Sequence, residues 1–181
     1  MKAYATSTLR RRLRQLFLFC AVLASGAAHA AFTLSDLQIA GRALGFLDKP
    51  VQGQVTAGIV YSPANPQSVR EAEALKDMLG DGLRIGNVTL RPVLIPVADL
   101  QHSTAALFLL TGGVEDTAPL ADAVRVKRIP CITTDLAQVK SGHCAIGVSS
   151  QPKIEILVNR NAATGSDLKF SAVFRMMITE M

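Results

Sequence analysis

The chain has 181 residues, with 19 lysines and arginines against 14 aspartates and glutamates. Five of the basic residues and none of the acidic ones lie in the first thirty, so the remaining 151 residues carry 14 charges of each sign. That balance excludes the broad positive surface that nucleic-acid binding needs, since only Arg125, Lys127 and Arg128 cluster. We therefore predict no nucleic-acid partner and interpret this trio as a solvated helix end.

Residues 1–30 have the pattern of a secretory signal peptide. A basic segment precedes an apolar core at residues 16–23, and Ala28-His29-Ala30 matches a small-x-small cleavage site. The core is much shorter than the ~20 apolar residues that cross a membrane. We expect cleavage after Ala30, a periplasmic location, no membrane span after cleavage, and one domain over residues 31–181. An uncleaved membrane anchor is the alternative.

The rest of the chain alternates helical and strand patterns. Residues 32–47 carry apolar side chains at three- and four-residue spacing, which predicts a helix capped by Thr33 or Ser35. Short aliphatic runs predict four strands, at residues 55–61, 88–97, 105–110 and 129–134. The segments between them predict helices at 67–79 and 117–127 and a short turn or helix at 99–100.

This order predicts a single-domain α/β fold, with a mostly parallel open sheet and flanking helices. The second strand contains Pro92 and Pro96, so either this strand lies at an edge of the sheet or the prolines lie at the margins of the strand. Beyond residue 134 we expect a short turn, a C-terminal antiparallel hairpin and a closing helix, at residues 135–139, 144–149 with 154–158, and 161–181.

Two cysteines, Cys131 and Cys144, follow the predicted signal peptide. An oxidising compartment favours a disulfide between them, worth about 3 kcal/mol for a loop of roughly a dozen residues. Two free buried thiols are the alternative. The chain has no Cys-x-x-Cys motif, the pattern that would indicate a redox catalyst. His143 and Cys144 point to opposite faces of a strand, so we predict no metal site.

Polar residues follow the predicted parallel strands, where α/β sheets bind ligands. The candidates for a small-molecule site are Tyr61, Ser62, Asn65, Thr111, Gly112 and Asp135. Asn65 or Ser62, Thr117 and Asp135 also stand before helical patterns, so helix capping explains them equally well. We find no phosphate-binding glycine motif and no Ser/His/Asp set, and therefore predict neither a cofactor nor an enzyme.

Several segments resemble the YfiR-like periplasmic proteins. In that family a strand ends in a Thr/Ser-Asp pair, followed by a glycine turn, an apolar strand, a strand that ends in an Asn-bearing segment, and a Leu/Met-rich last helix. The matching residues here are Thr134-Asp135, Ser141-Gly142, 145–148, 154–159 and 170–178. Residues 36–50, DLQIAGRALGFLDKP, are similar to the first helix of that family.

The resemblance implies a regulator without chemistry of its own. YfiR-like proteins repress an inner-membrane diguanylate cyclase by binding its periplasmic sensor domain, which links them to cyclic-di-GMP signalling. They tend to form homodimers, and their disulfides tie this control to the redox state. Residues 55–79 and 129–142 are also similar to one lobe of the periplasmic substrate-binding proteins of ABC importers. The alternative function is therefore a one-lobe small-molecule-binding protein.

Overall fold

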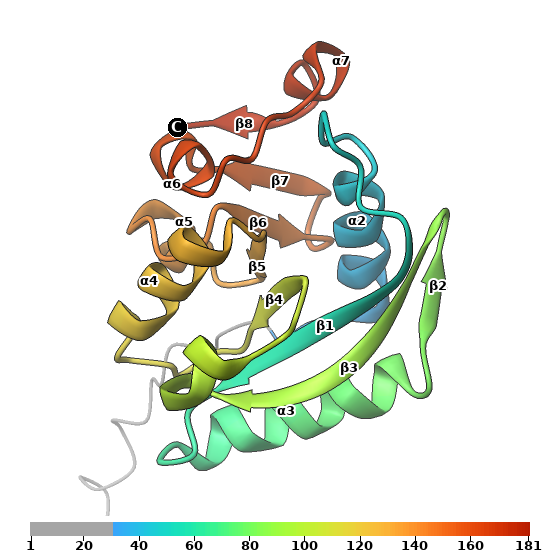
Figure 1. Ribbon diagram of the computed structural model, residues 1–181. Helices are drawn as coiled ribbons and strands as arrows, with labels where there is room; N and C mark the ends of the chain where they lie inside the picture. The colour runs from blue at the N-terminus through green and yellow to red at the C-terminus, as the bar shows by residue number, and fades with distance from the viewer. Residues whose placement is uncertain (1–30) are drawn as a thin grey trace, which may run out of the picture.

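The structure is a computed structural model that describes residues 31–181, so the predicted signal peptide and its cleavage site lie outside the described residues. Its strands are β1 (Gly53–Tyr61), β2 (Leu83–Ile85), β3 (Val88–Pro96), β4 (Leu107–Leu110), β5 (Cys131–Thr133), β6 (Ile146–Ser149), β7 (Glu155–Val158) and β8 (Thr179–Glu180). They form one sheet in the order β2-β3-β1-β4-β5-β6-β7-β8 (Figure 1).

The central strands β3, β1, β4, β5 and β6 all run parallel to one another. At one end β2 runs antiparallel to β3, and at the other β7 runs antiparallel to β6 and parallel to β8. The predicted fold class is confirmed: a single α/β domain with a mostly parallel sheet and an antiparallel hairpin of β6 and β7.

Helices cover both faces of the sheet. They are α2 (Leu34–Leu44), α3 (Pro66–Leu79), the 3-10 helix η1 (Val97–His102), α4 (Ala118–Lys127), α5 (Leu136–Lys140), α6 (Arg160–Gly165) and α7 (Ala172–Arg175). Side chains of β4 alternate between two hydrophobic clusters. Leu107 and Leu109 join the cluster that contains residues of α2 and α3, whereas Phe108 and Leu110 join residues of α4. Figure 1 shows α2 and α4 on opposite sides of the strands.

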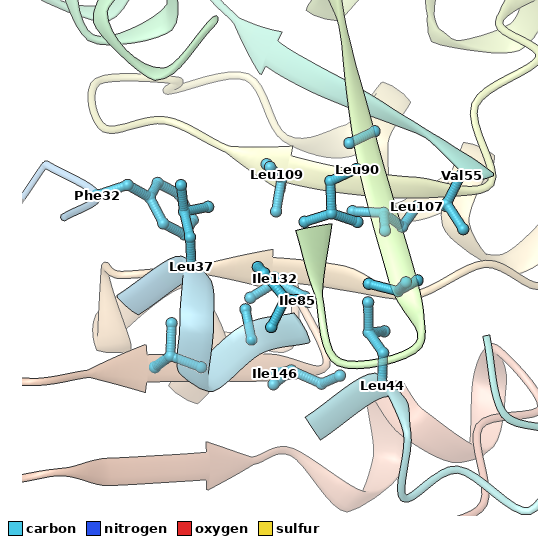
Figure 2. Packing of buried hydrophobic residues seen from close by; sticks show 14 of the residues in the cluster. Phe32, Leu37, Leu44, Val55, Ile85, Leu90, Leu107, Leu109, Ile132 and Ile146 are labelled. Atoms are coloured by element: carbon cyan, nitrogen blue, oxygen red, sulfur yellow. The ribbon is translucent and has the colours of Figure 1, made fainter. Parts of the chain in front are cut away.

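The first helix packs as its pattern predicts. Thr33 is the N-cap, and the Asp36 carboxylate accepts hydrogen bonds from the Thr33 backbone N–H at 2.9 Å and from its hydroxyl at 2.6 Å. This reciprocal capping fixes the start of α2. Leu37 and Leu44 are fully buried and belong to the hydrophobic cluster that also contains Ile132 and Ile146 (Figure 2). None of the helices in the described part of the chain is long and apolar enough to span a bilayer.

Strand β2 was not predicted, although Gly86-Asn87 gives the two-residue loop typical of a hairpin. Gly86 has φ +58°, a left-handed conformation that favours glycine. β2 pairs with β3 only as far as Leu90. Pro92 and Pro96 lie beyond that point, where β2 leaves the outer edge of β3 uncovered, so their missing N–H groups break no pairing with β2. The prolines therefore mark a local edge.

The predicted helix over residues 161–181 is wrong. The segment forms a short helix α6, a single turn α7 and the edge strand β8. Asp167, two residues after the end of α6, has φ +55°, which ends the helical path. Phe170 then forms an isolated bridge with Leu47, and β8 pairs with β7 through Leu157 and Thr179. Long-range pairing overrides the local helical spacing of the apolar residues.

Candidate functional site

The strand order reverses between β1 and β4, which brings together the loops that follow them. Ser62 and Thr111 meet there through Ser68 of α3. The Ser62 N–H donates to Ser68 Oγ over 3.0 Å, and the Ser68 and Thr111 hydroxyl oxygens are 2.9 Å apart. The Thr111 hydroxyl also donates to the carbonyl oxygen of Val60 over 3.0 Å. These residues, which were predicted to bind a ligand, therefore form hydrogen bonds with other residues of the protein.

Asn65 likewise forms hydrogen bonds with two separate segments of the protein. Its Oδ1 accepts the N–H of Gln67 at 2.9 Å and caps α3, while its Nδ2 donates to the carbonyl oxygen of Gly113 over 3.1 Å. The Gly112 N–H donates to Glu71 Oε2 over 2.9 Å. Capping by Asn65 is confirmed. The contact of Glu71 was missed, and no sequence signal marks it, because it depends on how α3 lies beside the loop after β4.

The remaining predicted residues lie in other surroundings. Asp135 caps α5, since one carboxylate oxygen accepts the Ala137 N–H at 2.9 Å. Tyr61 is half-buried and packs against the cluster under α2 and α3. Thr117 occupies the N-cap position of α4 but makes no side-chain capping bond. A ligand role for Tyr61, Ser62, Asn65, Thr111, Gly112 and Asp135 stays a prediction, with four of the six brought together.

Cys131 and Cys144 form a disulfide, as predicted, with their Cα atoms 4.9 Å apart. It joins the first residue of β5 to the segment that leads into β6, and both cysteines are fully buried beside Val124 of α4. His143, the neighbour of Cys144, is half-buried, and its Nδ1 lies 2.8 Å from Gln138 Oε1. Within residues 31–181, no three metal-ligating side chains converge.

Exposed apolar side chains concentrate near the end of the chain. Three of them, on α7 and directly after it, form what we call the C-terminal apolar surface: Val173, Met176 and Met177, with exposed fractions of 59, 80 and 60%. The buried ring of Phe174 supports this segment from beneath. It stacks on Phe46 with ring centroids 4.9 Å apart and contacts Phe170 at 5.3 Å. The segment is therefore fastened to the loop after α2.

Two arginines and one carboxylate flank this surface. The Arg175 Nε donates to Glu180 Oε1 over 3.0 Å, and the Arg160 Nη2 donates to Glu180 Oε2 over 3.0 Å. The hydrogen bond from Arg175 lowers the pKa of Glu180 from its usual value, partial burial opposes this, and Arg160 lowers it further. Both arginines stay more than half exposed while Glu180 is mostly covered, so the flank presents positive charge.

Comparisons with known proteins find no protein-family model and no curated protein that matches this chain. A crystal structure of a conserved domain protein from Vibrio cholerae O1 biovar El Tor superposes on it with a TM-score of 0.48 and 14% sequence identity. The match covers 81% of this chain and 58% of that one, so the chain spans little more than half the length of that protein.

Proposed function

We propose that this protein is a periplasmic, non-enzymatic regulator that binds the periplasmic domain of an inner-membrane diguanylate cyclase. The observation that carries the proposal is the C-terminal apolar surface. Large apolar side chains left in water at adjacent positions are typical of protein interaction sites. Methionine is common at such sites, because its flexible, polarisable side chain adapts to a partner. The resemblance to the YfiR-like proteins supplies the class of partner and the compartment.

The charges around the surface define the chemistry of the partner. Arg160 and Arg175 are exposed beside it, and the Glu180 carboxylate that they share is mostly covered. A complementary partner therefore has an apolar centre with an acidic rim, since opposite potentials favour encounter and fix the orientation. The two arginines also hold Glu180, and with it β8, in place. The same ion pairs thus order the surface and give it its charge.

A binding measurement with matched variants tests the proposal. Isothermal titration calorimetry would use the purified periplasmic domain of a membrane-anchored diguanylate cyclase from the same organism. Met176→Glu places a charge where the side chain is 80% exposed, and we expect binding to weaken at least tenfold, about 1.4 kcal/mol. Val126→Glu is the control, because Val126 is 70% exposed on α4, outside the surface.

Two results separate the parts of the proposal. Equal affinity of the Met176→Glu and Val126→Glu proteins would reject the C-terminal apolar surface but leave the partner in place. No association of the unaltered protein with the cyclase domain, together with unchanged cellular cyclic-di-GMP on gene deletion, would reject the regulatory function itself. Circular dichroism of both variants shows that each is folded before the comparison is made.

A further inference from the structure

A cleft of about 460 Å³ opens between α4, the turn that follows α5, and α6. Arg125 contributes from α4, Lys140 from the end of α5, His143 from the turn, and Asn161 from α6. These segments are far apart in sequence, and the sheet brings them together. The cleft is separate from the C-terminal apolar surface and from the loops after β1 and β4. Its volume lies in the range of small-molecule sites.

The base of the cleft is electrically neutral. Val124 and Ala145 are buried there, and Val124 packs in the same cluster as the Cys131–Cys144 disulfide. The buried polar residues at the base already have partners. Asn159 Nδ2 donates to the Val139 carbonyl over 2.9 Å, and the Ser166 hydroxyl donates to the Ala162 carbonyl over 2.9 Å. The unused hydrogen-bonding capacity of the cleft therefore belongs to its rim.

That rim carries an excess of basic groups. Arg125, Lys140 and His143 line the cleft, and Asp122 is the only carboxylate among its described lining residues. Asp122 Oδ1 accepts from Arg125 Nη2 over 2.7 Å, which occupies one part of the guanidinium and leaves its other N–H groups available. Residues 31–181 have equal numbers of acidic and basic charges, so the excess here is local.

The imidazole of His143 has a defined orientation. Its Nδ1 lies 2.8 Å from Gln138 Oε1, and an acceptor oxygen at that position fits the tautomer that carries its proton on Nδ1. Lys140 provides a charged donor from the end of α5, and Arg125 provides planar paired donors across the cleft. Guanidinium and ammonium groups together suit carboxylate or phosphate oxygens.

We propose that this cleft binds a small anion that carries a carboxylate or phosphate group on a short apolar body. The charged group contacts Arg125 and Lys140 at the rim, and the apolar body lies over Val124 and Ala145. The site is independent of partner binding by the C-terminal apolar surface. The disulfide ties the His143 side of the cleft to β5, because Cys144 is the next residue in the chain.

Nuclear magnetic resonance titration of the protein expressed from its full sequence tests this proposal. Inorganic phosphate and benzoate are added separately at constant ionic strength, and the amide signals of residues 141–143 and Asn161 are followed. We expect saturable shifts with at least one of the two probes. Arg125→Gln/Lys140→Gln removes two rim cations and should weaken the response at least about tenfold. Saturation by one probe alone identifies the anionic group that the cleft prefers.

The control removes the same charge from a different place. Arg70→Gln/Lys76→Gln deletes two exposed cations of α3, on the opposite face of the sheet, and should leave the titration unchanged. Shifts that rise linearly without saturation for both probes would overturn the proposal. An equal loss of response in the α3 variant would overturn it as well, because diffuse counterion attraction would then account for the shifts.

Discussion

The side-chain amide of Asn65 donates a hydrogen bond to the carbonyl oxygen of Gly113, over 3.1 Å, and ties the start of α3 to the loop after β4. The same asparagine caps α3 through its Oδ1. Gly113 has φ +70°, and a Cβ atom built on it would collide with the amide of Asn65. The reversal of strand order is therefore held by a contact that tolerates only glycine.

We predict that Gly113→Ala lowers the free energy of unfolding by about 2–3 kcal/mol. About 1 kcal/mol comes from a left-handed alanine, and the rest from displacing the Asn65 amide from its acceptor. Gly53→Ala is the control, because Gly53 has φ +73° and its Cβ would meet nothing within 4 Å. It should cost about 1 kcal/mol. Urea unfolding measures both, and equal losses would contradict the role of Asn65.

The buried disulfide gives a second prediction. Cys131→Ala/Cys144→Ala should lower the free energy of unfolding by about 3 kcal/mol, since the unfolded chain loses its cross-link. Both cysteines are fully buried, so a thiol reductant should act on the folded protein only when β5 and β6 separate. Thiol counting before and after denaturation measures this. Two titratable thiols in the oxidised, denatured protein would show that no disulfide exists.

The ion pairs of Glu180 predict a pH dependence at the end of the chain. Because the pKa of Glu180 is lowered in the folded protein, its contribution to holding β8 is complete above the usual value of 4.5. That contribution is lost as the pH falls through the lower, folded pKa. Carbon NMR of the Glu180 carboxyl measures the titration. Arg175→Gln should raise the pKa more than Arg160→Gln does, and the reverse order would contradict the assigned causes.

Methionine exposure predicts selective oxidation. Dilute hydrogen peroxide should convert Met176, Met177 and Met181 to sulfoxides before Met78, which is half-buried on α3. Peptide mass spectrometry gives the order of reaction. A sulfoxide at Met176 or Met177 makes the C-terminal apolar surface polar, so oxidised protein should also bind its partner less well. Oxidation of Met78 at the same rate would show that the exposures assigned to these residues are wrong.

Much of the fold could be predicted from the sequence, because strands that are buried on both faces consist of uninterrupted aliphatic residues. The run in β4 is the clearest case, since all four of its side chains are buried and no polar alternation is needed. The cap by Asn65 is also local, because it depends on residues two and three positions further on. Such features follow from neighbouring residues, and sequence patterns report them well.

Two of the errors have a common physical cause in long-range contacts, whereas the missed strand β2 had a local signal in Gly86-Asn87. Residues 161–181 have helical spacing, yet the pairing of β8 with β7 and the stacking of Phe174 on Phe46 decide their structure. The contact of Glu71 with Gly112 likewise joins segments that are distant in sequence. The C-terminal apolar surface escaped prediction for the same reason. A helix over these residues would have buried the methionines that the structure exposes.

The disulfide also has a topological consequence. Residues 131–144 form a closed covalent ring that contains α5 and the His143 side of the cleft. Lys140 is exposed and is the only tryptic site within that ring. A cut there opens the loop but leaves the two pieces of the chain joined, so a nicked molecule runs as one species until it is reduced. Proteolysis at this turn can therefore alter the cleft while the domain stays in one piece.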